Sequence, residues 1–225
     1  MRAPLSIIIP TLDAEEVLAA TLMALMEGLS AGLIREVIVS DGGSQDRTLK
    51  IADEAGAVVV SGAASRGGQL RRGGEVANAD WVMFLHADTC LEPGWSAAVE
   101  AHLPSDKAGY CTLRFADGGW QGRWVARWAN MRSALLGLPY GDQGLVMSKQ
   151  LYQSTGGYQD VPLMEDVAMA RALKGQLVVL PIVATTSAER YQRNGWLRRG
   201  GRNLWTLARY LLGASPERLV QSYRK

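Results

Sequence analysis

The chain has 225 residues, of which 48% are hydrophobic and 20% are charged, and its formal net charge is +2. This composition supports one well-buried domain and excludes a disordered chain, and a charge so close to zero gives no reason to expect nucleic acid as a partner. No segment approaches the roughly 20 apolar residues that span a bilayer. The short apolar run at 5–9 is not typical of a signal peptide, so we expect a cytoplasmic protein.

Strands and helices alternate along the first 90 residues. Apolar runs predict buried strands over 5–9, 34–40, 57–60 and 81–85. Helices are predicted over 14–29, from the N-cap Asp46 to residue 55, and from the glycines at 67–68 to residue 78. This alternation predicts a mainly parallel α/β sheet with helices on both faces, and such sheets bind ligands at the carboxyl ends of their strands.

The second half has a less regular pattern. We expect strands over 110–115, 145–148, 177–181 and 183–186, and helices over 120–136 and 165–174. A final amphipathic helix is predicted over 196–212, weakened by Gly200 and Gly201. Cys90 and Cys111 lack metal-ligand spacing and are expected in the core.

Polar residues follow three of the predicted strands. Thr11 and Asp13 follow the first strand, and Asp41 closes the second, ahead of two glycines. A carboxylate at Asp41 can accept a hydrogen bond from the edge of a base, and the alternative is a turn aspartate that caps its own loop. His86 and Asp88 follow the fourth strand and point to the same side of the chain.

Asp88 is a candidate ligand for Mg²⁺ or Mn²⁺. One carboxylate is enough when the oxygens of a diphosphate complete the coordination of the ion. His86 could hold a ribose, a phosphate or a softer metal. The alternative for Asp88 is the N-cap of a helix near Pro93.

Other polar segments fit a site as well as a simpler structural role. Glu165 and Asp166 open a helical pattern, where acids are either partners of the helix dipole or a general base for an acceptor hydroxyl. Asp142 and Gln143 lie in a glycine-flanked turn that is either structural or contacts the acceptor. Basic and amide side chains after the third strand could meet phosphates or lie in a solvated loop: Arg66, Gln69, Arg71 and Arg72.

The second half is also rich in tryptophan and arginine. Trp120, Trp124 and Trp128 recur every fourth residue, which favours core packing over an acceptor-binding or membrane-facing surface. Basic residues crowd the last stretch of the chain, a pattern that suits a phosphate-rich ligand, an anionic membrane surface or a solvated basic face. For the helix over 196–212 we favour packing on the domain over an interfacial position.

Together these segments resemble the family 2 glycosyltransferases, which have the GT-A fold, over roughly residues 5–191. The opening strand ends in Pro10-Thr11-Leu12-Asp13-Ala14-Glu15, with Asp13 where the family usually has Asn, and the next ends in Asp41-Gly42-Gly43-Ser44. The family's Asp-x-Asp motif reads His86-Ala87-Asp88, so that Asp88 matches the metal-binding acid and His86 replaces the first acid. With Gly141-Asp142-Gln143-Gly144 and Met164-Glu165-Asp166, this variant resembles a small bacterial subgroup.

The resemblance implies a metal-assisted, inverting transfer from a UDP-sugar to a hydroxyl acceptor, with Asp166, beside Glu165, as the base. It places Pro10, Thr11, Glu15 and Asp41 around the uracil, Arg66 near the nucleotide and His86 near the ribose. The complete set of expected nucleotide-binding residues is Pro10, Thr11, Glu15, Asp41, Gly42, Arg66, Gln69, His86, Ala87 and Asp88. Asp142 and Gln143 are expected to contact the acceptor.

Within a single domain we expect a nucleotide-binding half (1–90), an acceptor and catalytic half (91–190) and a basic helical tail (191–225). A lipid-linked acceptor and a peripheral contact with the inner face of a membrane are compatible with the basic tail. Two alternatives stay open. One is a catalytically silent nucleotide-binding module, which the histidine at 86 favours; the other is a sugar-phosphate nucleotidyltransferase, which would need a glycine-rich basic loop after the first strand.

Overall fold

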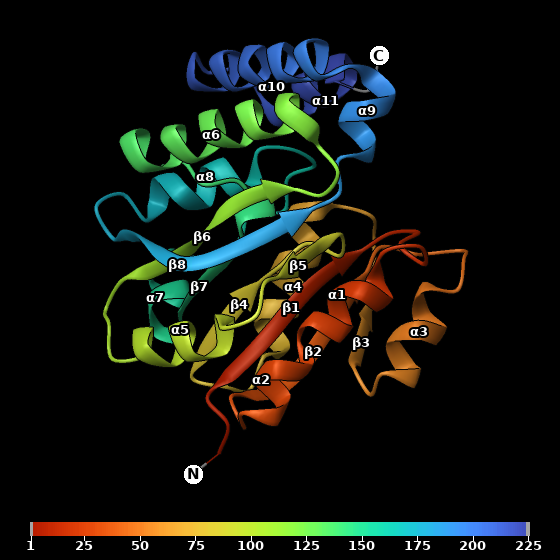
Figure 1. The fold of residues 1–225 in the computed structure, drawn as a ribbon, viewed down its shortest axis with the longest axis vertical. Helices are drawn as coiled ribbons and strands as arrows, with labels where there is room; N and C mark the ends of the chain where they lie inside the picture. The colour runs from red at the N-terminus through yellow and green to blue at the C-terminus, as the bar shows by residue number, and fades with distance from the viewer. Residues whose placement is uncertain (1, 224–225) are drawn as a thin grey trace.

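A sheet of eight strands runs through residues 2–223, the part of the chain that this computed structural model describes (Figure 1). The strands lie in the order β3-β2-β1-β4-β7-β6-β8-β5. Their bounds are β1 (Leu5–Thr11), β2 (Ile34–Asp41), β3 (Val58–Ser61), β4 (Trp81–Phe84), β5 (Thr89–Leu91), β6 (Ala108–Phe115), β7 (Leu145–Ser148) and β8 (Leu177–Thr186). Only β7 and β5 run antiparallel to their neighbours, so the sheet is mainly parallel, as predicted.

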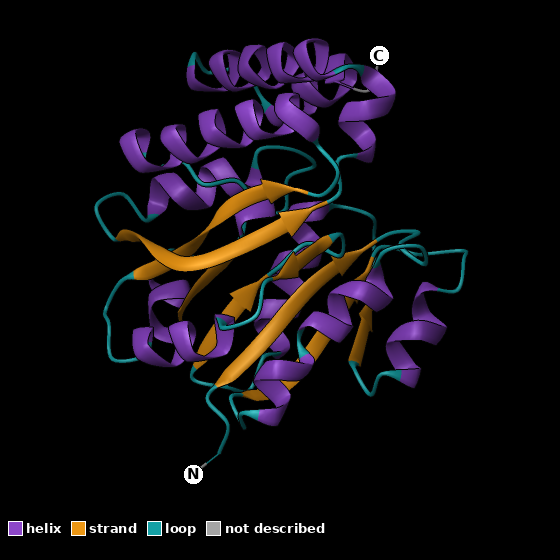
Figure 2. Ribbon diagram, viewed as in Figure 1, coloured by secondary structure: helices purple, strands orange, loops and turns teal. Residues whose placement is uncertain are grey.

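Helices cover both faces of the sheet and also form a layer at the carboxyl-terminal end of the chain (Figure 2). Their bounds are α1 (Leu18–Ala24), α2 (Met26–Ser30), α3 (Thr48–Glu54), α4 (Arg66–Val76), α5 (Trp95–His102), α6 (Gly119–Leu136), the 3₁₀ turn η1 (Gly141–Gln143), α7 (Lys149–Ser154), α8 (Glu165–Ala172), α9 (Glu189–Asn194), α10 (Trp196–Leu211) and α11 (Pro216–Tyr223). This arrangement confirms the predicted α/β class and the helical C-terminal segment.

The core lies on the two faces of the sheet because successive strand residues point to opposite sides. Ile7 and Ile9 of β1 pack in one cluster with Trp95 of α5. Ile8, between them, packs in a second cluster with Leu70 of α4. Each fully buried side chain of this kind contributes about 1.5–3 kcal/mol relative to an exposed one, so an uninterrupted apolar run is stable only in a strand covered on both faces.

The helix predicted over 14–29 is in fact two short helices, and the first begins only at Leu18. The preceding turn is held by the neighbouring loop. The backbone N–H of Ala14 donates to Thr48 Oγ1 at 2.8 Å, and that of Glu15 donates to Asp46 Oδ2 at 2.9 Å. These tertiary bonds fix the chain in a non-helical turn that helical periodicity alone does not reveal.

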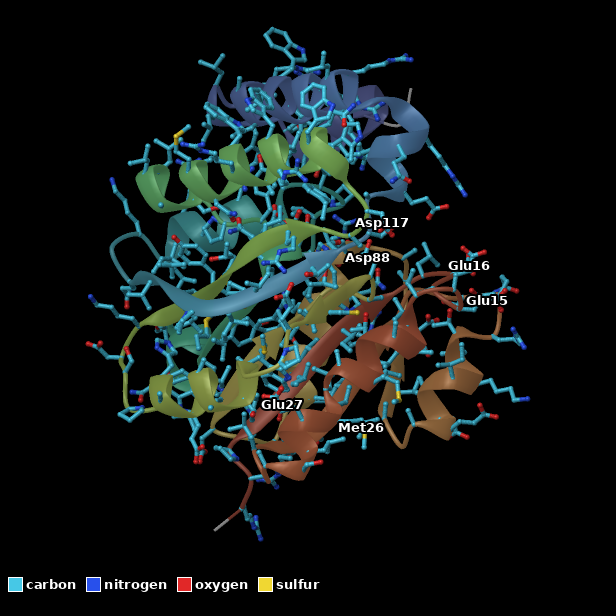
Figure 3. The ribbon with its side chains drawn as sticks, viewed as in Figure 1. Glu15, Glu16, Met26, Glu27, Asp88 and Asp117 are labelled. Atoms are coloured by element: carbon cyan, nitrogen blue, oxygen red, sulfur yellow. The ribbon has the colours of Figure 1, made fainter. Side chains whose placement is uncertain are left out.

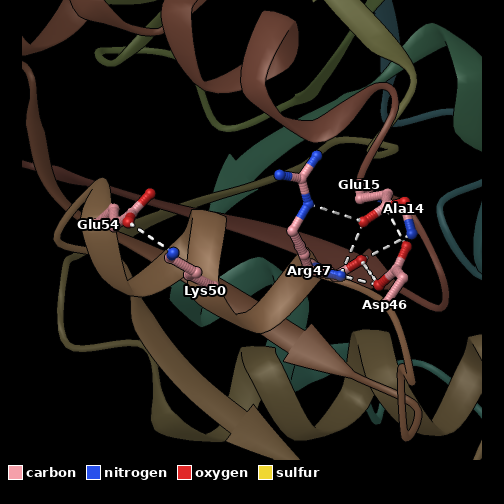
Figure 4. A network of polar contacts seen from close by, with 7 residues as sticks. Ala14, Glu15, Asp46, Arg47, Lys50 and Glu54 are labelled. Atoms are coloured by element: carbon pink, nitrogen blue, oxygen red, sulfur yellow. Dashed lines mark hydrogen bonds and ion pairs between the residues drawn. The ribbon is translucent and has the colours of Figure 1, made fainter.

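Asp46 is not the N-cap of α3, as the sequence had suggested. Arg47 occupies the N-cap position and makes no side-chain capping bond. Asp46 accepts hydrogen bonds from the backbone N–H and Oγ1 of Thr48, and from the amide of Glu15. Its carboxylate therefore joins the loops that follow β1 and β2 (Figure 4).

Two strand predictions also differ from the structure. β5, only three residues long, was not predicted, and β8 is one continuous strand where two were expected. Pro181 lies inside β8, at the point where the pairing with β6 shifts register opposite Cys111. A proline is tolerated there because a bulge leaves one backbone amide without a ladder partner.

The tryptophan stripe of α6 is not part of the core, and the expectation of core packing was wrong. Trp120, Trp124 and Trp128 are 69%, 61% and 41% exposed. The opposite side of α6 packs on the sheet through Ala126 and Ala129. A spacing of four residues shows that the tryptophans share one side of the helix. It does not show whether that side or the opposite one is buried.

The last helices pack on the domain. Leu207 of α10 and Leu219 of α11 are buried with Val167 of α8. Among residues 2–223, no helix combines the length and the apolar character needed to cross a membrane. Cys111 is buried, as expected, whereas Cys90 is half-buried.

Candidate functional site

The carboxyl ends of the parallel strands carry the expected polar residues. Figure 3 shows Glu15 and Asp88 toward the same end of the sheet, whereas Glu27 and Met26 lie at the opposite end. The register pairs the last residue of β1, Thr11, with the last residue of β2, Asp41. Polar groups from separate strand ends are thus brought to one edge, as the predicted topology requires.

Asp41 is buried and holds its own loop. Its Oδ1 accepts hydrogen bonds from Thr11 Oγ1 at 3.0 Å and Ser44 Oγ at 2.5 Å, and its Oδ2 accepts from the amides of Gly43 and Ser44. Burial raises the pKa of Asp41, but these hydrogen bonds outweigh it and hold the pKa below its usual value. Four donors saturate the carboxylate, so the structure favours the loop-capping role over direct contact with a base.

Gln69 connects the same two strand ends from α4. Its Nε2 donates to the carbonyl oxygens of Thr11 at 2.6 Å and Ser40 at 3.0 Å. A Cβ added to Gly42 would come within 3.1 Å of this amide nitrogen, so the loop has little room for a side chain at that position. Gln69 and Gly42 therefore shape the strand-end loop.

Glu15 lies on the outer side of this loop. Its Oε2 accepts from the backbone N–H of Arg47 at 2.9 Å and from Arg47 Nε at 3.3 Å (Figure 4). The Arg47 side chain is 77% exposed, so this ion pair contributes at most about 1 kcal/mol. The contact orders the loop without burying either charge.

A pocket of about 130 Å³ brings together six of the expected residues. Its acidic and basic side chains come from five separate segments. The expected residues on its wall are Arg66, His86, Asp88, Asp142, Glu165 and Asp166. The expected residues outside this wall are Pro10, Thr11, Glu15, Asp41, Gly42, Gln69, Ala87 and Gln143. The pocket thus joins the segment after β4 with η1 and the start of α8.

Asp166 is held in place by two backbone amides. Its Oδ2 accepts from the N–H of Gly141 at 3.1 Å, and its Oδ1 accepts from the N–H of Val167 at 2.7 Å. Met164, just before α8, has a φ of +68°, in the left-handed region that non-glycine residues rarely adopt. This strained residue turns the chain so that Glu165 and Asp166 open α8 at the pocket wall.

Glu165 is only 2% exposed and forms an ion pair with Arg66, whose Nε lies 3.7 Å from Glu165 Oε1. Burial raises the pKa of Glu165, and the neighbouring Asp166 raises it further, while Arg66 opposes the shift. The contact brings Arg66, the first residue of α4, to the pocket. Glu165 therefore positions the Arg66 guanidinium beside Asp166, which is more accessible than Glu165.

Asp142 also faces the pocket. Its Oδ1 is buried and has no hydrogen-bond partner among the described residues. Burial raises the pKa of Asp142 to about 6, with Arg132 opposing the shift and Asp166 and Asp88 adding to it. A buried carboxylate oxygen without a donor marks a place where a ligand, water or cation can bind.

Gln143 has a structural role. It is fully buried, its Oε1 accepts from Ser133 Oγ at 2.5 Å, and its Nε2 donates to the carbonyl of Cys111 at 3.0 Å. These bonds secure the η1 turn beneath the pocket. The structure thus separates Asp142, on the wall, from Gln143, below it.

His86 fits closely against Gly141. A Cβ added to Gly141 would overlap His86 Nε2, so a side chain at this position would force the imidazole or the turn to shift. Among residues 2–223, no three His, Cys, Asp or Glu side chains cluster closely enough to hold a metal ion by themselves. A cation here would need further ligands from substrate oxygens and water, which is how Mg²⁺ and Mn²⁺ are commonly bound beside phosphates. Asp88 and the unpartnered Asp142 Oδ1 are compatible with such a site.

Part of the pocket wall could not be predicted from the sequence. Tyr191, Arg199 and Asn203 line it from α9 and α10, and Phe115 lines it from the end of β6. The density of basic residues after residue 190 was the only signal, and it did not indicate that this segment returns to the sheet edge. α9 and α10 are therefore part of the site.

A mainly parallel sheet with a pocket of acidic and basic groups at its carboxyl edge, together with the family match that follows, makes the chain a glycosyltransferase of the GT-A class that depends on a nucleotide sugar. Residues 6–154 match the family model described as "Glycosyl transferase family 2". The chain belongs to that family. No curated protein matches it.

Solved structures agree with this fold. Glucosyl-3-phosphoglycerate synthase from Mycobacterium tuberculosis, in complex with Mn²⁺ and UDP-glucose, is 22% identical, with a TM-score of 0.58 over 82% of this chain and 69% of the other. TarS 1-349 from S. aureus, in complex with UDP-GlcNAc, is 14% identical, with a TM-score of 0.62 over 81% of this chain and 58% of the other. At these identities the likeness concerns the fold.

Proposed function

We propose that the protein transfers a sugar from a UDP-sugar to a hydroxyl group of an acceptor, with inversion at the anomeric carbon. The observation that carries this proposal is the meeting of Asp88, Asp166 and Arg66 in one pocket, from segments far apart in the chain. Support for the donor comes from the structural neighbours, whose crystals hold UDP-glucose, UDP-GlcNAc or UDP. A pocket with both acidic and basic groups suits a reaction in which a proton is removed and a diphosphate departs.

The loop at the ends of β1 and β2 holds the nucleoside. Asp41 and Gln69 fix this loop from inside, so it is formed before the nucleotide binds. Pro10, Thr11, Glu15, Gly42 and Ala87 contribute shape and backbone groups there. Preorganisation lowers the entropic cost of binding.

The diphosphate lies toward α4 and the segment after β4. Arg66 begins α4, where backbone N–H groups and the helix dipole favour anions, and its guanidinium reaches the pocket. His86 contacts the ribose or a phosphate. Arg66 is positioned for this task by its ion pair with Glu165.

Asp88 would hold a divalent metal ion, Mn²⁺ or Mg²⁺, together with diphosphate oxygens and water. Bound there, the ion would offset the negative charge that grows on the diphosphate. The neighbouring synthase structure that contains UDP-glucose also contains Mn²⁺. Asp142, whose Oδ1 lacks a hydrogen-bond donor, faces the same pocket and would contact the acceptor or water there.

Asp166 acts as the base. Two amides orient its carboxylate, and it is more accessible than Glu165. The proton of the acceptor hydroxyl passes to Asp166 as that oxygen bonds to the anomeric carbon. The bond from this carbon to the diphosphate oxygen breaks on the opposite face, and UDP leaves with the electron pair. Attack from the face opposite UDP inverts the anomeric configuration.

A screen of nucleotides by thermal shift, with and without Mn²⁺, tests the donor. We expect stabilisation to require both UDP and the metal, since only ligands that bind the folded state raise the melting temperature. Equal stabilisation by ADP and GDP, or none by UDP with Mn²⁺, would contradict the UDP-sugar assignment.

Turnover is tested by UDP release in the presence of acceptors that carry a free hydroxyl, and inversion by the anomeric proton coupling of the product. A catalytically silent module would bind UDP and the UDP-sugar but would not cleave the UDP-sugar, so no UDP would be released. A nucleotidyltransferase has no support in the structure, because the segment after β1 contains Asp13 and Glu15 and no glycine.

A further inference from the structure

Two apolar stripes lie on neighbouring helices at the carboxyl-terminal end of the molecule. On α6 the stripe runs from Trp120 through Trp128 to Leu135, and on α10 it runs from Leu197 through Trp205. Figure 1 shows α10 lying alongside α6, and the two helices are in contact. Leu197 is 81% exposed and Leu135 is 75% exposed, so neither stripe is covered by the rest of the described chain.

The two stripes meet in an apolar groove of about 460 Å³ between the first turns of α6 and α10. Trp120 and Trp124 form one wall, and Trp196 and Leu197 form the other. Since both walls open into one groove, the stripes face the same side at this end. Exposed apolar surface of this extent is rare in a soluble domain without an interaction partner.

The charge on the two helices themselves has one sign. α6 and α10 contain no Asp or Glu, and the exposed arginines Arg123, Arg127 and Arg198 border the groove and its stripe. Tryptophan and arginine together suit the boundary between lipid headgroups and acyl chains, where the rings lie among the chains and the guanidinium groups reach the phosphates. A second copy of this chain would place the same arginines against each other, which is unfavourable.

We propose that the α6–α10 face, defined by the two stripes and their arginines, docks on an anionic lipid bilayer. The apolar side chains enter the headgroup region while the helices lie in the plane of the membrane. The sheet and its strand-end loops stay on the aqueous side.

The docking face lies next to the catalytic pocket. Trp196 of the groove stacks on Tyr191 with ring centroids 4.9 Å apart and packs edge-on against Phe115 at 5.4 Å. Tyr191 and Phe115 also line the pocket. Docking therefore brings the pocket close to the level of the headgroups, and a membrane-resident acceptor could present its hydroxyl there. This consequence rests on the proposed function, whereas the docking itself does not.

The test is co-sedimentation of the full chain with vesicles of phosphatidylcholine, alone or mixed with phosphatidylglycerol. We expect binding to the mixed vesicles, weakened by salt, and little binding to phosphatidylcholine alone. The double variant Trp120→Ser/Trp124→Ser should lower the partition coefficient by at least about tenfold, because the loss of each ring removes apolar area from the docking face. Arg123→Gln and Arg127→Gln should each lower it by about fivefold at low salt.

A matched control removes exposed apolar side chains elsewhere. Met23 and Met26 are 70% and 49% exposed, and Figure 3 shows Met26 far from α10. Met23→Ser/Met26→Ser should bind vesicles like the wild type. Lipids brominated near the headgroup should quench the tryptophan fluorescence of the wild-type protein in mixed vesicles.

The proposal is overturned if the wild type does not bind the mixed vesicles, or if the tryptophan variant binds as well as the methionine control. It is also overturned if sedimentation velocity shows a dimer that the tryptophan variant loses, because the face would then belong to a second copy. Thermal shift with UDP and Mn²⁺ reports separately on the proposed function, so failure of one leaves the other standing.

Discussion

The backbone N–H of Gly141 donates a hydrogen bond to Asp166 Oδ2 at 3.1 Å. The same glycine lies directly against His86. One residue of the η1 turn therefore contacts both the proposed base and the imidazole of His86. The η1 turn, for which a purely structural role was an open alternative, thus connects the start of α8 with the segment after β4.

Replacing Gly141 with alanine should disturb this arrangement. The new Cβ would overlap His86 Nε2, so His86 or the η1 turn must move. Because small displacements of reacting groups cost much of the rate, we expect kcat/KM to fall by roughly 10²-fold. The matched control is Gly201→Ala, where the added Cβ meets no atom within 4 Å and should stabilise α10 by about 0.5–1 kcal/mol. Equal activity of the two variants would show that the close fit has no role.

Asp88→Asn should remove the Mn²⁺-dependent part of UDP binding, because a neutral amide is a poor ligand for a hard cation. Isothermal titration with UDP, in the presence of Mn²⁺ or EDTA, measures the difference. Asp117→Asn is the control: Asp117 is exposed, and its positive φ is tolerated by asparagine. Metal-dependent binding that survives in Asp88→Asn would place the cation elsewhere.

Asp166→Asn should keep UDP binding and lose transfer by roughly 10²- to 10⁴-fold, since the amide oxygen can keep one of the two backbone hydrogen bonds but cannot remove a proton. Donor affinity and single-turnover rates separate the two effects. Asp53→Asn, an exposed change on α3, should leave both unchanged. Full transfer by the Asp166 variant would exclude this residue as the base.

Asp142 should make stability depend on pH. Its pKa is raised from 3.8 to about 6, so the folded state binds this proton more tightly than the unfolded chain. The contribution of Asp142 to the free energy of unfolding is then greatest at a pH below 3.8, the pKa in the unfolded chain. It falls as the pH rises from 3.8 to about 6, the pKa in the folded protein. In EDTA, we expect Asp142→Asn to be more stable than wild type by about 1–3 kcal/mol above the folded pKa, and to have lost this part of the pH dependence. Urea unfolding at a series of pH values from below 3.8 to above 6 measures this difference. If the free energy of unfolding depended on pH in the same way in both proteins, the raised pKa of Asp142 would be refuted.

The central strands could be predicted from the sequence because their physical cause is local. Uninterrupted apolar runs such as Ile7–Ile9 are stable only inside a covered sheet, and the alternation with helices makes that sheet parallel. Parallel strands end at one edge, so the positions of Asp41 and Asp88 at that edge also followed from the sequence. Glu165 and Asp166 were expected at the site because of the resemblance to the family, and their roles stay predictions.

Contacts between distant segments decided the rest. Asp41 occurs at the predicted strand end, but only the structure shows that Thr11 and Ser44 already occupy its carboxylate. The period of Trp120, Trp124 and Trp128 fixes a helical side and leaves open whether protein covers it. Whether α10 returns to the pocket at the sheet edge depends on packing between residues far apart in the chain, which no local pattern encodes. The sequence by itself thus determined which side chains reach the sheet edge, and the tertiary structure decided which of them are free to act, because burial and hydrogen bonding depend on the neighbours that folding brings together.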